Sequence, residues 1–150
     1  MMGSTVTIGG VPEGFDADII LRQMQRDGRP LMHIARDDKR LAAFAEAVRF
    51  FAPDMPVIEF PAWDCLPYDR VSPNADISAR RMATLAGLVH GMPKQFILLT
   101  TLNAAMQRLP ARQVLRDAAF RAEVGRPIDE EALRSFLVRM GFSKAPTVLE

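Results

Sequence analysis

The chain has 150 residues, a formal net charge of +1 and a hydrophobic fraction of 49%. The small net charge argues against chain-wide attraction to DNA or anionic membranes, which depends on clustered lysines and arginines. One cysteine and two histidines exclude an intrachain disulfide and disfavour a structural zinc site. Apolar runs of about five residues are far shorter than the roughly 20 that span a bilayer. We therefore expect a cytoplasmic protein that is not embedded in a membrane.

Apolar runs and segments of helical periodicity alternate up to Pro110. The expected strands are 6–8, 31–35, 56–60 and 95–100, and the expected helices run from about 16 to 26, 38 to 51, 76 to 90 and 101 to 108. Continuously apolar strands are typical of strands buried on both faces. The pattern predicts an α/β fold with a parallel sheet flanked by helices.

The helix starts and the buried helix faces are also predictable. The expected N-cap residues are Asp16 or Asp18, Asp37 or Asp38, Asp76, Thr101 and Asp129. The second helix is expected to face inward with Leu41, Phe44, Ala45, Val48 and Phe51, and the third with Met82, Leu85, Leu88 and Val89.

The sequence pattern changes after Pro110. Residues 120–124 alternate as a half-exposed strand does, Asp129 begins a helix, and 142–150 look extended. This part reads as the start of a smaller α+β unit, which is too small to bury much core alone. We predict a first domain at 1–115 and an incomplete second unit at 116–150, and expect the natural protein to continue beyond Glu150.

The turn after residues 6–8 contains Gly9, Gly10 and Gly14, at the place of a phosphate-binding loop. A phosphate-binding loop needs a lysine for the phosphates and a serine or threonine for magnesium. Here Phe15, Asp16 and Ala17 follow, and an acidic residue at a helix start repels phosphate. We expect a degenerate loop without a cofactor; a nucleotide-binding enzyme on the same sheet is the alternative.

The other reactive side chains give weaker signals, and we predict no catalytic residue and no metal site. His33 lies in an apolar strand without a nucleophilic partner and reads as a hydrogen-bonded core or surface histidine. Cys65 reads as a small apolar side chain. Asp64, Asp69 and Asp76 could form an acidic cluster, but turn closure and helix capping explain them more simply.

A long loop with three prolines joins the third expected strand to the third expected helix, and it contains Trp63 and Tyr68. Connections of this length are usually functional or disordered. The two aromatic side chains suit recognition of a protein or nucleic acid, and they also suit packing of the loop onto the domain. Arg80 and Arg81 follow on the helix about 100° apart, so only one can face inward. We expect one to pair with a loop aspartate and the other to be solvated.

The loop and helix together resemble a known family. The matching residues are Trp63, Asp64, Leu66, Pro67, Tyr68, Asp69, Arg80 and Arg81. They are similar to the N-terminal region of bacterial transcription-repair coupling factor (Mfd), whose N-terminal module resembles the excision-repair protein UvrB. The resemblance implies a degenerate RecA-like body at 1–115, carrying an inserted unit from 116 that binds UvrA.

The resemblance also implies the function. This segment would be a non-catalytic scaffold that recruits UvrA to lesion-stalled RNA polymerase. RNA polymerase, double-stranded DNA, ATP and magnesium would be bound by other domains of the full-length ATP-dependent translocase. UvrB itself has an intact phosphate loop and a DNA-clamping hairpin, and this sequence has neither.

A UvrB-type nucleotide- or DNA-binding module remains the alternative. The cations available to it are Arg80, Arg81, Arg108, Arg112 and Arg116.

Overall fold

A computed structural model describes residues 5–65, 70 and 72–145. The chain forms two compact units, the first ending at Arg108 and the second starting at Leu109. The elements of the first unit are α1 (Phe15–Asp27), β1 (Leu31–Ala35), α2 (Asp38–Phe51), β2 (Val57–Phe60), α3 (Ala75–His90), β3 (Ile97–Thr101) and α4 (Leu102–Met106).

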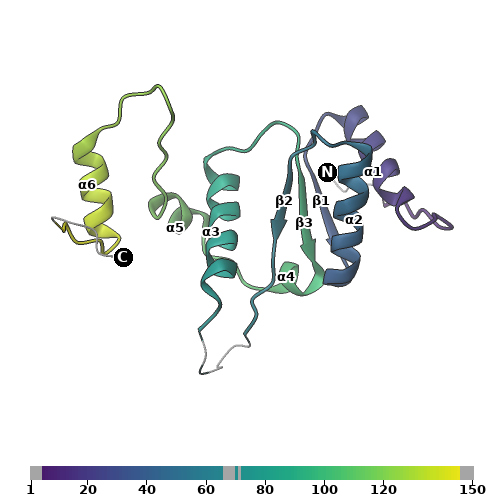
Figure 1. Cartoon of the computed structure of the whole chain (residues 1–150), viewed down its shortest axis with the longest axis horizontal. Helices are drawn as coiled ribbons and strands as arrows, with labels where there is room; N and C mark the ends of the chain where they lie inside the picture. The colour runs from purple at the N-terminus through teal and green to yellow at the C-terminus, as the bar shows by residue number, and fades with distance from the viewer. Residues whose placement is uncertain (1–4, 66–69, 71, 146–150) are drawn as a thin grey trace. The chain divides into compact units, whose positions relative to one another are not determined.

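The three strands form a parallel sheet in the order β1-β3-β2. Seen edge-on, the sheet has α3 on one side and α1 and α2 on the other (Figure 1). The predicted α/β fold with a parallel sheet and flanking helices is confirmed. Because parallel strands all end at the same edge, the loop after β2 and the start of α4 lie at one end of the sheet.

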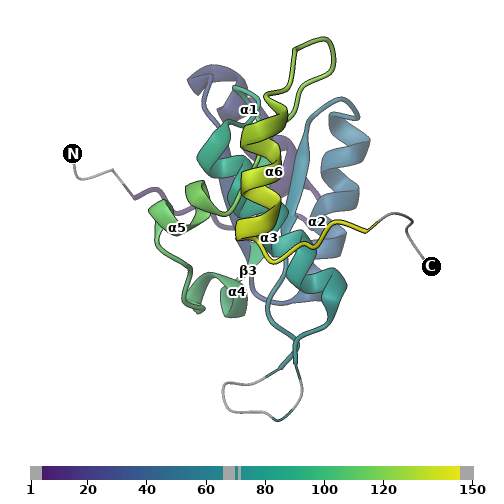
Figure 2. The same ribbon diagram turned by 90° about the vertical axis from the view of Figure 1, so that its left-hand side faces the viewer.

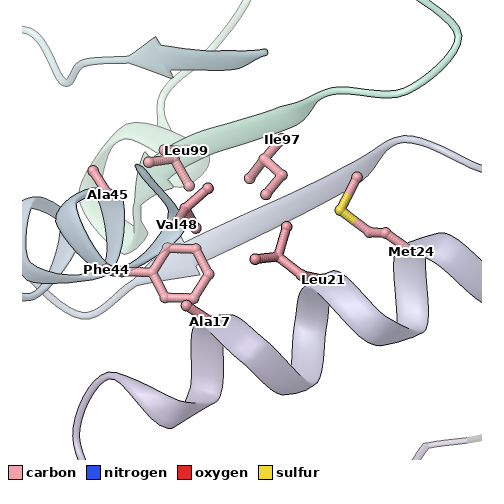
Figure 3. Packing of buried hydrophobic residues seen from close by; sticks show 8 residues of the cluster. All are labelled: Ala17, Leu21, Met24, Phe44, Ala45, Val48, Ile97 and Leu99. Carbon is pink, nitrogen blue, oxygen red and sulfur yellow. The ribbon is translucent and has the colours of Figure 1, made fainter. Parts of the chain in front are cut away.

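The core lies between the sheet and the α1–α2 pair. Its buried residues are Ala17, Leu21, Met24, Phe44, Ala45, Val48, Ile97 and Leu99 (Figure 3). The prediction for α2 is confirmed at Phe44, Ala45 and Val48, whereas Phe51 at the last turn is 41% exposed. The last turn of α2 extends beyond the core residues, so helical periodicity alone overestimates how many of its residues are buried.

Three of the predicted helix caps are confirmed. The side chains of Asp37, Thr101 and Asp129 accept backbone N–H groups at the starts of α2, α4 and α6 (Glu130–Arg139). Asp76 is not a cap, because Asn74 accepts the N–H of Asp76 and begins α3 earlier.

The predicted cap of α1 by Asp16 or Asp18 is also wrong. Gly14 is the N-cap, with a φ of 89° that a glycine adopts without strain. The helix therefore begins at Phe15, and both aspartates lie within its first turn.

Two strand predictions fail in the first unit. Residues 6–8 form no strand, and Val6 and Ile8 are 75% and 59% exposed. In β1, Met32 and Ile34 are largely exposed, so this strand is not buried on both faces. The reason is that α3 covers this face mainly at β2, the opposite edge of the sheet.

The second unit contains α5 (Arg112–Asp117) and α6, joined by a connection without regular structure (Figures 1 and 2). The predicted strand at 120–124 is wrong: Phe120 instead packs its ring 5.6 Å from the ring of Phe136. An isolated strand has no partner for its backbone hydrogen bonds, so the alternating pattern is not sufficient. The sequence did not predict α5, and the expected boundary after residue 115 falls inside it.

Candidate functional site

The glycine turn before α1 holds an ion-pair cluster. Arg40, from the first turn of α2, places its two terminal nitrogens 2.8 Å from carboxylate oxygens of Glu13 and Asp16. Gly10 and Gly14 both have positive φ angles, and a Cβ at Gly9, Gly10 or Gly14 would meet nothing within 4 Å. The glycines therefore serve the backbone path of the turn. The arginine beside this turn is already neutralised by two carboxylates of the protein itself.

His33 lies near this cluster and packs against α2, but the hydrogen bond expected for it is not found at Nε2 within the described part of the chain. Its ring stacks on Phe44 with the centroids 3.7 Å apart and the planes 3° apart. Burial lowers the pKa of His33, the charge of Asp16 opposes that shift, and the charge of Arg40 adds to it. Nε2 of His33 and Oδ1 of Asp16 are buried without a hydrogen-bond partner among the described residues. The stacking on Phe44 and the burial of the ring both favour the neutral form of the imidazole.

The loop after β2 is fixed at its root by Arg81, whose side chain is among the most buried in the chain, at 1% exposure. Its guanidinium carbon lies 4.2 Å from the ring centre of Phe60 and 4.4 Å from that of Trp63. Such contacts attract a cation to the negative face of an aromatic ring. The guanidinium also donates to the carbonyl oxygen of Pro61, and burial lowers its pKa. Arg81 is the inward-facing member of the arginine pair.

Gln107 connects this arginine to the loop backbone. Its Oε1 accepts from Nη1 of Arg81 and from the backbone N–H of Trp63, both at 3.0 Å. Gln107 directly follows α4, the short helix after β3, so a side chain remote in sequence from the loop completes the loop root. We call the set Phe60, Trp63, Arg81 and Gln107 the loop-root cluster.

The sequence did not predict this cluster. Apolar periodicity assigned Met82 and Leu88 to the inner face of α3, but both are 40% exposed, and Arg81 and Thr84 are buried beside Leu85. A helix that packs on the edge strand β2 meets carbonyl groups, and Thr84 Oγ1 lies 3.4 Å from the carbonyl oxygen of Glu59. The signal that could have predicted this face of α3 was the spacing of the polar residues Arg81 and Thr84 around Leu85.

Arg80 points away from the loop-root cluster. It lies 2.7 Å from a carboxylate oxygen of Glu59 in β2 and 3.9 Å from Asp76. Of the three candidate aspartates, Asp76 is the one within ion-pair distance of Arg80, and it lies in the first turn of α3; Asp69 lies outside the described residues. Asp64 instead accepts the backbone N–H of Asn74 and closes the loop, as predicted for turn aspartates.

The remaining motif residues, Leu66, Pro67, Tyr68 and Asp69, lie outside the described residues. Their expected roles stay predictions.

A cavity of about 620 Å³ adjoins the loop-root cluster. Trp63, Cys65 and Pro73 line it from the loop, and Asn103, Met106, Gln107 and Arg108 line it from α4 and the residues after it. Its described walls combine apolar side chains with an amide and a guanidinium, and they hold no pair of groups suited to nucleophilic or acid–base catalysis.

Within the described part of the chain, no group of three or more histidine, cysteine or acidic side chains is arranged to hold a metal ion. No helix there is long and apolar enough to cross a membrane.

The first unit is thus an α/β domain with an ion-paired glycine turn and a loop anchored by a buried arginine. No family model matches the chain. The transcription-repair-coupling factor of Myxococcus xanthus is 34% identical over 127 residues, a match that covers 79% of this chain and 10% of that protein. Those of Escherichia coli (strain K12) and Haemophilus influenzae are each 28% identical, covering 89% and 95% of this chain and 11% and 12% of those proteins.

The chain belongs to the family of transcription-repair-coupling factors, and the match fits an N-terminal part of them. The predicted family is confirmed. The chain spans about a tenth of the length of these curated relatives.

Proposed function

We propose that this chain is a non-catalytic scaffold of a cytoplasmic factor in transcription-coupled nucleotide excision repair. The scaffold recruits UvrA to RNA polymerase stalled at a lesion. Membership of the transcription-repair-coupling factor family supports the pathway. The second unit carries the UvrA-binding role, together with residues beyond 150, whereas polymerase, double-stranded DNA, ATP and magnesium are bound by other parts of the full-length translocase.

The observation that carries the non-catalytic proposal is the ion-paired glycine turn. Arg40 is bound by Glu13 and Asp16 beside the glycine turn at the N-terminus of α1, and helix N-termini are the ends at which nucleotide-binding loops hold phosphate. No lysine, serine or threonine lies between Gly9 and Ala17 to contact phosphate or magnesium. A nucleotide would have to displace both carboxylates and would still lack these two groups.

Calorimetric titration with ATP and magnesium tests this proposal. We expect no measurable heat of binding to the 150-residue chain. Micromolar affinity would contradict the scaffold proposal and favour a nucleotide-binding enzyme on the same sheet.

UvrA recruitment is tested by a pull-down with two proteins, this chain and the same chain extended by roughly a hundred residues, about one small domain. We expect UvrA to bind the extended protein and to bind this chain weakly or undetectably. If neither protein retains UvrA, the recruiting role is wrong. The ATP titration does not depend on this result.

A DNA-binding module is the competing proposal, and the arginine contacts argue against it. Arg80 is paired with Glu59, and Arg81 is buried between two rings. Neither guanidinium is free to contact a phosphate. Steeply salt-dependent binding of a duplex oligonucleotide would overturn this reading, because release of counterions is the signature of phosphate contacts.

A further inference from the structure

The cavity beside Trp63 lies at the carboxyl ends of the strands. Trp63 follows β2 closely, and α4 directly follows β3, so both walls are built where parallel strands end. In open α/β sheets, ligands bind outside this edge. The cavity volume of about 620 Å³ is also in the usual range for binding sites.

The walls of the cavity suit a protruding side chain of another protein. Met106 is 79% exposed, and Asn103 and Arg108 are exposed too, so the far wall is open to solvent. Small-molecule sites bury most of their ligand, which an open wall does not do. Tryptophan, methionine and arginine are the residue types that protein-binding surfaces concentrate.

Trp63 is held in place before any partner arrives. Its ring lies against the Arg81 guanidinium, and its backbone N–H is bound by Gln107. A wall that is already ordered does not have to lose that conformational freedom on binding. The loop-root cluster therefore preorganises Trp63 for binding.

The positive charge of Arg108 at the cavity favours an acidic partner. Arg108 is the charged residue among the described lining residues, and none of the ion pairs found among the described residues includes it. Arg40 and Arg80, by comparison, are each neutralised by carboxylates. A cation without a carboxylate partner among the described residues, beside an apolar surface, matches a carboxylate next to an apolar side chain. It does not match a nucleic acid strand, which needs several cations along its backbone.

We propose that this cavity docks a protein segment in which an aromatic or large aliphatic side chain is flanked by carboxylates. The apolar side chain enters between Trp63 and Met106, and a carboxylate pairs with Arg108. Every residue involved belongs to the first unit, so this docking site is separate from the UvrA recruitment proposed for the second unit.

Trp63 is the single tryptophan of the chain and lines the cavity, so its fluorescence reports binding directly. The probes are two short peptides, acetyl-Glu-Phe-Glu-amide and acetyl-Lys-Phe-Lys-amide, titrated into the whole chain at low salt. We expect a saturable change with the acidic peptide at a Kd on the order of 1 mM. The basic peptide should bind about tenfold more weakly, because reversing its charge turns an exposed attraction into a repulsion.

Variants of the exposed wall identify the site without threatening the fold. Arg108→Gln and Met106→Ser should each weaken the acidic peptide about threefold, in line with the loss of one exposed contact. Only Arg108→Gln should also reduce the preference for the acidic peptide. The matched control is Arg112→Gln, an exposed arginine of the second unit that should change neither value.

Several results would overturn the docking proposal. Equal binding of the two peptides would show that Arg108 does not select a carboxylate. The absence of any saturable change in Trp63 fluorescence, or an unchanged preference in Arg108→Gln, would remove the site. Saturable binding of an eight-residue oligothymidine in place of the peptides would reassign the surface to nucleic acid. UvrA retention in the pull-down is independent of all these outcomes.

Discussion

The glycine turn and the loop-root cluster each hold an arginine, and they neutralise it in opposite ways. At the glycine turn, Arg40 pairs with two carboxylates and its side chain remains 30% exposed. In the loop-root cluster, Arg81 is almost fully buried between two rings and donates to neutral oxygens. Exposed ion pairs contribute little to stability, whereas a buried polar group that loses its partner is costly.

This difference separates two roles for the same residue type. Arg40 ties the glycine turn to α2 through two partly exposed ion pairs, and we expect its contribution to folding to be small. Arg81 fixes the loop that carries Trp63 and therefore shapes the cavity beside it. Substitution of Arg81 should therefore lower the free energy of unfolding more than substitution of Arg40. Trp63 fluorescence can follow the unfolding of the first unit.

The largest expected effect comes from Arg81→Ala. It removes two ring contacts and two hydrogen bonds and leaves a cavity, so we expect a loss of about 3 kcal/mol in the free energy of unfolding. Urea denaturation followed by Trp63 fluorescence measures it. Arg80→Ala, one position earlier with an exposed ion pair, should lose less than about 1 kcal/mol. Equal losses for the two variants would contradict the contrast.

The next effect is that of Gln107→Ala, which removes the acceptor shared by Arg81 and the Trp63 backbone N–H. We expect a loss of about 1–2 kcal/mol, since two donors lose one partner at a partly buried site. Combined with Arg81→Ala, the loss should be smaller than the sum of the two, because both changes affect one hydrogen-bond network. Strict additivity in this double-mutant cycle would show that the two side chains do not act together.

The sequence predicted three strands and the buried face of α2 well and the loop root poorly, for different physical reasons. Strand and helix positions follow from local periodicity, so β1, β3 and the buried face of α2 around Phe44 were accessible. The contact between Gln107 and Trp63 joins residues 44 positions apart and depends on the pairing of β2 with β3. No local sequence pattern predicts a contact between strands that are distant in sequence. A prediction based on apolar periodicity also assigns Arg81 to the exposed face of α3.

The same limit explains the strand predictions that failed. Residues 6–8 and 120–124 have strand-like patterns, but a strand needs a neighbour to satisfy its backbone groups. Whether a neighbour exists is a property of the whole fold. The family resemblance succeeded where pattern reasoning stopped, because the run from Trp63 to Arg81 is distinctive as a sequence even though its contacts are not local.

A pH titration examines the histidine behind the glycine turn. Burial lowers the pKa of His33 below its ordinary value of 6.5, so the unfolded chain binds this proton more readily than the folded one. The stabilisation from neutral His33 is fully present above pH 6.5, and it is lost as the pH falls below 6.5 toward the folded-state pKa. Urea denaturation at several pH values should show stability falling with acidification through this window.

Two variants isolate the contribution of His33. His33→Phe keeps a ring against Phe44 and should flatten the pH dependence just below pH 6.5. His90→Gln removes the other histidine and should keep the part of the slope that His33 contributes. A His33→Phe protein with the slope of the parent would show that this imidazole is not held neutral by the core.

The smallest expected effect is that of Arg40→Gln at the glycine turn. Its two ion pairs are partly exposed, so the free energy of unfolding should fall by less than about 1 kcal/mol, and by less still at high salt. A loss near that of Arg81→Ala would erase the contrast between the two sites.

The double variant Glu13→Gln, Asp16→Asn is the sharper probe, because it removes both carboxylates that pair with Arg40 beside the turn. Even so, we expect no ATP binding in calorimetry, since the chain still lacks the lysine and hydroxyl that hold phosphate and magnesium. Measurable ATP affinity in that variant would mean that the two carboxylates alone keep nucleotide out.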